Sequence, residues 1–329
     1  SRLVIENRSN RPRRLSVTAY LEWVLGASRE VSAPHVTTEV DPVTGAMIAR
    51  NRWSEEFAQI VSFADLVVQW GAGKGQRLTG DRTEFIGRLG HPSAPVGLEP
   101  GSVLSGRVGA GLDPCAALQT TIELGIGARS EVAVILGSCD NLTEAQRLIG
   151  AYRNADIGAT FEGVKRGWAE TLDIVQVSTP DRAFDIMLNR WLPYQTLSSR
   201  VLGRTGFYQA GGAYGFRDQL QDTMAISTMQ PKLARELILR SASRQFLEGD
   251  VQHWWHPPSG RGVRTRISDD RLWLPYAVSH YLTLTGDAAL LDEAVGFIEG
   301  PPLAAGVEDS YYTPTTSALS ASLFEHGAR

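Results

Sequence analysis

Four polar side chains that could bind a ligand, Arg217, Asp218, Gln221 and Asp222, lie within the stretch from Gly206 to Met229. A helix advances by about 100° per residue, so a helix over this segment places all four on one arc. Its other positions are largely apolar, which predicts burial, and buried charges need partners. One interpretation is a self-neutralising arginine–aspartate cluster near a helix N-terminus. The preceding glycine-rich approach favours the other interpretation, a polar wall of a binding pocket.

Two adjacent tryptophans, Trp254 and Trp255, lie between His253 and His256. Flat indole faces can pack against the C–H faces of pyranose rings, although bulky aromatics also fill ordinary cores. The two histidines have no cysteine nearby and no helix to fix their spacing, so they are weak evidence for a metal, and none is expected. The tetrapeptide therefore favours sugar binding.

Arginines in two segments could hold an anion such as phosphate, because a planar guanidinium can bond two of its oxygens at once. Arg204 precedes Arg217 in the approach to the polar helix, and we expect both to converge on one phosphate held against a neutral sugar. Arg261, Arg264 and Arg266 lie in a glycine-containing stretch. These three could bind an anion or form a solvated basic loop.

Two consecutive acids, Asp269 and Asp270, precede Trp273 at helical spacing. Such acids could cap the helix that follows them. They could also accept hydrogen bonds from sugar hydroxyls, and the two roles are compatible.

Three long motifs occur in order along the chain: FYQAGGAYGFRDQLQD at 207–222, GDVQHWWHPPSGRGVRTRISDDRLWLPYAVSHY at 249–281, and EGPPLAAGVEDSYYTPTTSALSASLFEHGAR at 299–329. They resemble the glycoside phosphorylases of glycoside hydrolase family 94, which includes cellobiose and chitobiose phosphorylases. The second and third motifs most closely resemble the phosphorylase-like domain of cyclic β-1,2-glucan synthases. The resemblance covers nearly the whole chain.

The resemblance implies inverting phosphorolysis of a β-linked glucan, with β-1,2 the expected linkage. In that reaction inorganic phosphate attacks the anomeric carbon opposite the leaving sugar, and one carboxylic acid protonates the glycosidic oxygen, which yields glucose 1-phosphate. No second catalytic carboxylate is required, because phosphate is already an anionic nucleophile. The expected substrate-binding residues are Asp222, Arg217, Trp254, Trp255, Asp270 and Gln221, and the expected phosphate-binding residues are Arg217 and Arg204.

The sequence departs from the family pattern at the catalytic acid, which in these phosphorylases is an Asp in a Trp-Asn-Asp segment. That tripeptide is absent from the chain, and the family's later phosphate-contacting His and Thr-Gly residues fall beyond the matched region. No catalytic residue is therefore assigned. We expect the chain to be a fragment that is inactive by itself, from either a free oligoglucan phosphorylase or a glucan synthase.

Alternating and β-branched runs without intervening helices predict an antiparallel β-sandwich over residues 1–140, in agreement with the resemblance. Residues 141–177 are predicted as a helical linker. Residues 178–329 are predicted to be almost wholly helical, as part of an (α/α)6 toroid. The predicted helices are Asp181–Ser199, Phe216–Met229, Pro231–Ser243, Asp270–Thr285, Ala288–Ile298 and Thr315–His326.

The 329 residues, 43% hydrophobic, are enough for two domains with sizeable cores. A net charge of −4 argues against nucleic acid or an anionic membrane as a partner. Cys115 and Cys139 are the only cysteines, so no disulfide framework is expected and a cytoplasmic location fits, for a free enzyme or for the cytoplasmic part of a membrane-anchored synthase. Expected partners are β-glucan oligosaccharide and phosphate, without a cofactor. A homodimer and the remainder of a longer polypeptide stay open as protein partners.

Two alternative functions also stay open. An (α/α)6 glycoside hydrolase would need a pair of suitably spaced catalytic carboxylates and would be indifferent to phosphate. A carbohydrate-binding fragment without catalysis would bind sugar but transform nothing.

Overall fold

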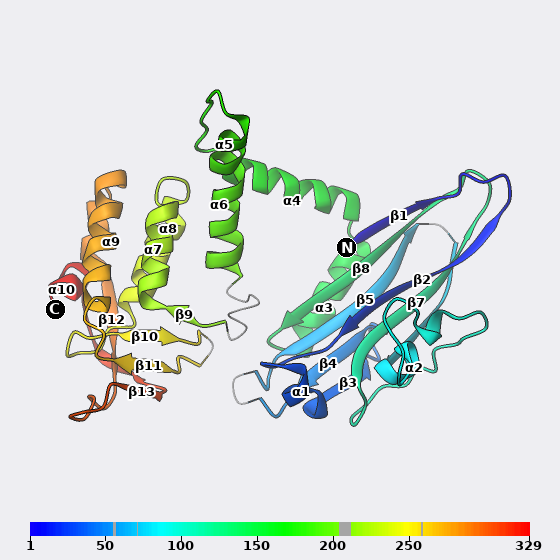
Figure 1. Cartoon of the computed structure of the whole chain (residues 1–329), viewed down its shortest axis with the longest axis horizontal. Coiled ribbons are helices and arrows are strands. Elements are labelled where there is room, and N and C mark those ends of the chain that lie inside the picture. The colour runs from blue at the N-terminus through cyan, green and yellow to red at the C-terminus, as the bar shows by residue number, and fades with distance from the viewer. Residues whose placement is uncertain (55–56, 71, 204–211, 258) are drawn as a thin grey trace. The chain divides into compact units, whose positions relative to one another are not determined.

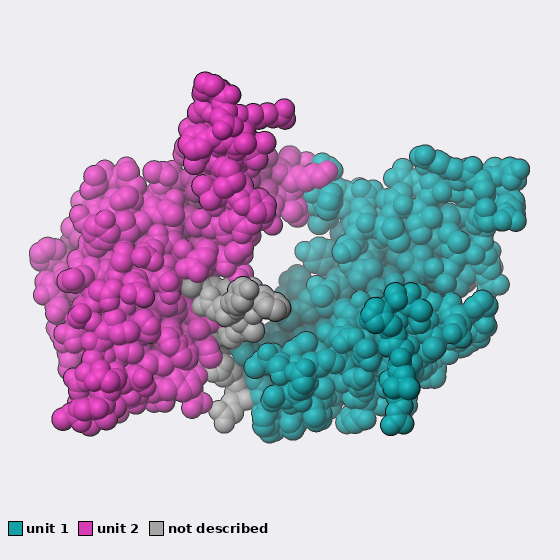
Figure 2. Space-filling model, viewed as in Figure 1, with its two compact units in different colours: residues 1–163 teal, residues 164–329 magenta. Residues whose placement is uncertain are grey.

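The computed structural model describes residues 1–54, 57–70, 72–203, 212–257 and 259–329 (Figure 1). These residues form two compact units, Ser1–Gly163 and Val164–Arg329 (Figure 2). The division falls inside helix α4 (Ile157–Leu172), within the segment that the sequence predicts to be a helical linker.

The first unit is built mainly from two antiparallel sheets. One has five strands in the order β1-β8-β5-β4-β3, and the other has three in the order β2-β7-β6. The strands are β1 (Arg2–Glu6), β2 (Arg13–Glu22), β3 (Val36–Val40), β4 (Met47–Asn51), β5 (Val61–Trp70), β6 (Ala72–Asp81), β7 (Pro114–Leu124) and β8 (Arg129–Cys139). The helices are α1 (Arg29–Ser32), α2 (Arg82–Ile86) and α3 (Leu142–Asn154), with 3-10 turns at Ala33–His35 and Val96–Leu98.

Strand periodicity explains how this unit buries its apolar side chains. Met47 and Ala49 of β4 lie in one core together with Leu118 of β7, so this core joins the two sheets. Ile48, between them, lies in a second core, where Ile149 of α3 covers the other face of the larger sheet. Successive side chains of a strand point to opposite faces, so one strand serves both cores. The predicted antiparallel sandwich is confirmed.

The second unit mixes helices with small sheets. Its first helical segment runs through α5 (Arg182–Ile186), a π-helical stretch (Met187–Trp191), α6 (Leu192–Gln195) and a second π-helical stretch (Thr196–Leu202). The later helices are α7 (Phe216–Ile226), α8 (Pro231–Ala242), α9 (Asp270–Thr285), a 3-10 turn (Ala288–Asp292) and α10 (Leu323–Ala328). The strands are β9 (Tyr214–Gly215), β10 (Gln252–Trp255), β11 (Gly262–Thr265), β12 (Ala294–Glu299), β13 (Asp309–Tyr312) and β14 (Thr315–Ser322).

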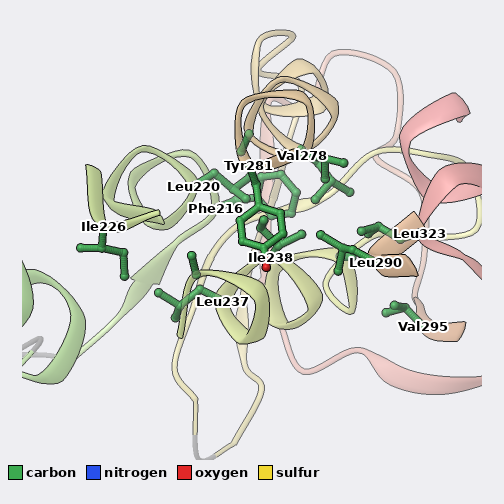
Figure 3. Packing of buried hydrophobic residues seen from close by; sticks show 14 of the residues in the cluster. Phe216, Leu220, Ile226, Leu237, Ile238, Val278, Tyr281, Leu290, Val295 and Leu323 are labelled. Carbon is green, nitrogen blue, oxygen red and sulfur yellow. The ribbon is translucent and has the colours of Figure 1, made fainter. Parts of the chain in front are cut away.

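The core of the second unit is made where α7, α8 and α9 pack together, as Figure 3 shows. Phe216 and Leu220 of α7 meet Leu237 and Ile238 of α8 and Tyr281 of α9 in this cluster. Each of these side chains is at most 3% exposed. Because one face of α7 is committed to this core, its polar residues must occupy the remaining face.

Two predicted helices of the second unit are wrong. Residues 288–298 form a short 3-10 turn followed by β12, and residues 315–326 form β14 followed by α10. Val295 and Phe297 are both buried, two positions apart, which is the period of a strand. The Thr- and Ser-rich residues of β14 have low helix propensity and pair with β12 in antiparallel register.

The second unit also contains a four-stranded sheet in the order β13-β11-β10-β9. The prediction that residues 178–329 are almost wholly helical is therefore wrong. The strands of this unit are short and lie between loops and helices. The helical periodicity of the neighbouring segments therefore led to a helical prediction for the whole region. The (α/α)6 toroid stays a prediction.

Candidate functional site

Helix α7 presents its polar residues because its apolar positions are used in the core. Phe216, Leu220 and Ile226 are fully buried. Gly215 immediately precedes the helix, and any side chain there would collide with the carboxylate of Asp218. The glycine therefore lets the strand β9 enter the helix while Asp218 folds back over the first turn.

Asp222 is held by Arg200, which the sequence interpretation did not single out. The Arg200 Nε donates to both carboxylate oxygens of Asp222, at 3.0 and 3.2 Å. Asp218 lies 3.6 Å from the same guanidinium. The hydrogen bond to Asp222 is the main cause that raises the pKa of Arg200. Asp222 is therefore an oriented hydrogen-bond acceptor whose side chain is only 12% exposed.

Arg200 reaches α7 because its own helical stretch packs into the same core. Leu197 and Val201, one helical turn apart, are both buried in the cluster with Phe216. Arg200 lies between them in sequence and so emerges beside the α7 residues. The π-helical geometry of this stretch cannot be read from the sequence, which is why the pairing was not predicted.

Arg217 pairs with Asp269 rather than with the acids of its own helix. The Arg217 guanidinium donates to Asp269 Oδ2 at 2.9 Å, and the Trp273 indole N–H donates to the same oxygen at 3.3 Å. The hydrogen bond from Arg217 is the main cause that lowers the pKa of Asp269. Asp269 holds the N-cap position of α9, but its side chain accepts no capping hydrogen bond from the backbone N–H groups of the first turn. Its role is to fix Arg217, not to cap the helix.

Asp270, the next residue, is buried and pairs with His253 of β10. The His253 Nδ1 lies 2.7 Å from Asp270 Oδ2, and Asp270 is 1% exposed. The other carboxylate oxygen, Oδ1, is buried and has no hydrogen-bond partner among the residues that the structure describes. The hydrogen bond with Asp270 is the main cause that raises the pKa of His253.

The two tryptophans of β10 have different surroundings. Trp255 is fully buried, and its indole stacks with Tyr214 at a ring distance of 5.9 Å and lies under the Arg244 guanidinium. Trp254 is half-buried and contacts the ring of Tyr311 at 5.3 Å. The packing interpretation therefore holds for Trp255, whose faces are covered, and Trp254 stays the candidate for stacking on sugar.

Other predicted site residues are not brought into this group. Gln221 is exposed, and no hydrogen bond joins it to the other predicted site residues that the structure describes. Arg264 is saturated by Asp250 and by backbone carbonyls, and Arg266 donates to three backbone carbonyls. Arg264 therefore has no donor left for an anion, whereas Arg266 is exposed and is held by the backbone of its own loop region. Arg204 lies outside the described residues.

Three cation–carboxylate pairs thus lie on neighbouring segments of the second unit: Arg200–Asp222, Arg217–Asp269 and His253–Asp270. Carboxylates paired with cations in this way can also accept hydrogen bonds from hydroxyl groups. When Asp218 is included, this group contains four carboxylates but only two guanidinium groups and one imidazole. This balance favours a neutral polyol over an anion, and the phosphate contacts of Arg217 stay a prediction.

The described part of the chain contains neither a candidate metal site nor a candidate membrane-spanning helix. Within it, no three His, Cys, Asp or Glu side chains gather in a way that could hold a metal ion. None of its helices is both long and apolar enough to cross a membrane.

Comparison with known families gives two consecutive matches. Residues 1–155 match the family model described as the glycosyl hydrolase 94 supersandwich domain. Residues 167–328 match the one described as the glycosyl hydrolase 94 superfamily catalytic domain. Together the two matches account for nearly all of the sequence.

Individual relatives include a synthase and several phosphorylases. The chain is 44% identical over 328 residues to the cyclic β-(1,2)-glucan synthase of Rhizobium meliloti (strain 1021), covering 100% of this chain and 11% of that protein. It is 24% identical over 331 residues to the N,N'-diacetylchitobiose phosphorylase of Vibrio furnissii, covering 90% of this chain and 40% of the relative. Identity to the solabiose phosphorylase of Paenibacillus borealis is 27% over 314 residues, with 90% and 37% covered. The chain thus spans about a tenth of the synthase and less than half of either phosphorylase.

Proposed function

This chain belongs to glycoside hydrolase family 94, and we propose that it supplies the sugar-binding part of an inverting phosphorylase-type enzyme acting on β-linked glucan. We take the linkage to be β-1,2. The observation that carries the linkage is the 44% identity to a cyclic β-(1,2)-glucan synthase along the whole of this chain. Similarity to phosphorylases over most of the chain supports the use of phosphate.

In this proposal the residues of the second unit bind and orient the sugar. Asp222, fixed by both of its oxygens on Arg200, accepts sugar hydroxyls at the non-reducing side of the bond that is cleaved. Asp270 accepts a further hydroxyl, and Trp254 offers an aromatic face. Inorganic phosphate then attacks the anomeric carbon in line with the leaving sugar, whose glycosidic oxygen is protonated by a general acid that we do not assign to any residue of this chain.

Arg217 and Arg204 are the proposed phosphate contacts. Arg217 is fixed by Asp269 at 2.9 Å, and its side chain is 40% exposed, so part of the guanidinium stays accessible. Since the described carboxylates outnumber the cations here, tight phosphate binding needs additional positive charge beyond Arg217.

The test is an assay of the complete polypeptide that carries this sequence. It is incubated with β-1,2-, β-1,3- and β-1,4-linked glucooligosaccharides, with and without phosphate, and glucose 1-phosphate and free glucose are measured. Phosphate-dependent release of glucose 1-phosphate from the β-1,2 substrate is expected. Release of glucose at the same rate without phosphate would instead establish a hydrolase.

The isolated chain is expected to bind sugar without cleaving it. General-acid assistance typically contributes about 10²–10⁴-fold to such a reaction, and the family acid motif is missing from the sequence. Calorimetric titration of the chain with β-1,2-glucooligosaccharide should therefore show binding, while glucose 1-phosphate stays at background. Full turnover by the chain alone would mean that an acid within it, such as Asp218, does the work.

A further inference from the structure

Only one of the two carboxylate oxygens of Asp270 has a hydrogen-bond partner among the described residues. Its Oδ2 lies 2.7 Å from His253 Nδ1, whereas its Oδ1 is buried without a hydrogen-bond partner among the described residues. The residue is 1% exposed, so bulk water does not solvate Oδ1. A buried acceptor without a partner costs free energy, and native proteins keep few such groups. The free oxygen is therefore suited to a ligand that donates a hydrogen bond.

His253 owes its direction to an irregularity in β10. Gln252 pairs with Arg264 and Trp254 pairs with the adjacent Val263, so two steps on β10 match one step on β11. The intervening residue, His253, is the extra residue of a β-bulge. Bulges bend a strand and re-aim a side chain, and they are common next to active sites. Here the bulge turns His253 toward the first turn of α9.

Charged groups on two elements act on this imidazole. Asp270, on α9, favours its protonated form through the hydrogen bond and through charge. On α7, Asp218 also favours that form and Arg217 opposes it, as burial of the ring does. The net effect raises the pKa of His253. The positive charge that His253 then carries lies beside the buried carboxylate of Asp270.

We propose that His253 is a positioning residue, which occupies Oδ2 of Asp270 and so leaves Oδ1 in place to accept a hydroxyl of the bound glucan. This inference rests on the proposed function, because it requires a sugar in the site. His253 itself need not touch the sugar. Without it, the buried carboxylate would lose its only hydrogen-bond partner among the described residues, and its side chain would no longer be held in this orientation.

The test measures KM and kcat for β-1,2-glucooligosaccharide in the complete polypeptide carrying His253→Ala or His253→Gln. The contact through Asp270 is made in the ground state and the transition state alike, so its loss should raise KM and leave kcat unchanged. We expect His253→Ala to raise KM about 10-fold or more, the size of a lost charged hydrogen bond. His253→Gln keeps a donor and should recover part of this loss.

The pH profile separates the charge of His253 from its hydrogen bond. The pKa of His253 is raised, so the ring is charged at low pH and becomes neutral as pH rises through that pKa. The ratio of KM between His253→Gln and the wild type should therefore be largest at low pH and approach 1 as pH rises. A ratio independent of pH would contradict the positioning role.

His326 provides a control, because it is hydrogen-bonded like His253 but lies fully buried in the core. Its Nδ1 lies 2.7 Å from Gln245 Oε1 and its Nε2 lies 3.0 Å from the Val295 carbonyl oxygen, both within the core. His326→Gln should lower the melting temperature and leave KM unchanged. If His253→Ala behaves in the same way, His253 is only structural and the inference fails. If the wild type releases no glucose 1-phosphate, the proposed function fails first, and the inference falls with it.

Discussion

Two groups of charged side chains in the second unit use their hydrogen-bonding capacity to different extents. The first, which we call the Arg264 cluster, consists of Arg264, Asp250, Glu248 and the ring of Phe246. Arg264 is 2% exposed and donates to both oxygens of Asp250 at 2.7 Å, to Glu248 at 3.1 Å and to two backbone carbonyls. Phe246 lies 3.9 Å from the guanidinium carbon. Every N–H group of Arg264 is thus engaged within the protein, and none is left for a ligand.

The second group, which we call the open row, consists of the pairs Arg200–Asp222, Arg217–Asp269 and His253–Asp270. Arg200 and Arg217 keep 42% and 40% of their side chains exposed, and one oxygen of Asp270 has no partner among the described residues. The two groups have similar composition and lie in the same unit. The difference teaches that the extent to which hydrogen-bonding groups are already satisfied, rather than charge, separates this structural ion cluster from the proposed binding site.

The largest expected effect is on stability, in the Arg264 cluster. Asp250→Ala leaves Arg264 buried without its main partner and should cost about 3–5 kcal/mol of unfolding free energy. The matched change Glu248→Ala removes a carboxylate that is 55% exposed and should cost no more than about 1 kcal/mol. Urea unfolding followed by circular dichroism measures both. If the two variants lose equal amounts of unfolding free energy, the buried contact with Asp250 contributes no more than the exposed contact with Glu248.

The two tryptophans of β10 extend the comparison to apolar side chains. Trp255→Ala removes a fully buried indole and should cost about 3–5 kcal/mol of stability. Trp254→Ala should cost less stability, because the ring is half-buried, but should weaken sugar binding. Thermal melting and calorimetric titration of both variants check this. A Trp254 variant with unchanged sugar affinity would remove Trp254 from the site.

Within the open row, the largest effect on function is expected at Asp222. In the complete polypeptide, Asp222→Ala should lower kcat/KM by about 10²-fold, or about 2.7 kcal/mol, as expected for lost charged hydrogen bonds. Glu236→Ala, which removes an exposed carboxylate from α8, is the control and should change nothing. Near-normal activity of the Asp222 variant would mean that Arg200 and Asp222 form only a self-neutralising pair.

The sequence predicted the local elements of this region better than their pairing. The bounds of α9 and the first residue of α7 were predicted correctly, because apolar periodicity is local information. Arg217, Asp222, Trp254 and Asp270 were singled out by their residue types and spacing. Which partner each would take depends on segments far away in the chain, and no spacing rule contains that information.

Two residues show what the sequence interpretation missed. Arg200 lies 22 residues before Asp222 and reaches it through a π-helical stretch. His253 was considered only as a metal ligand, whereas a β-bulge turns it toward Asp270. The available signal was a titratable side chain next to an aromatic pair. The strands β12 and β14 were missed for a related reason, since long-range pairing overrides weak local preference.

The smallest expected effect concerns the two histidines, whose pKa values shift in opposite directions. The pKa of His253 is raised, chiefly by its bond to Asp270, so its stabilising contribution is complete below the unfolded pKa and disappears as pH rises through the folded one. Burial lowers the pKa of His326, so its contribution is present above the unfolded pKa and is lost as pH falls through the folded one. The destabilisation caused by His253→Gln should therefore decrease with rising pH between about 5 and 8, and that of His326→Gln should increase. Both changes should be the smallest of those predicted, because each depends on the titration of a single imidazole. Urea unfolding at several pH values measures both. If the two destabilisations change with pH in the same direction, the histidine of the open row is held in the same way as the histidine of the core.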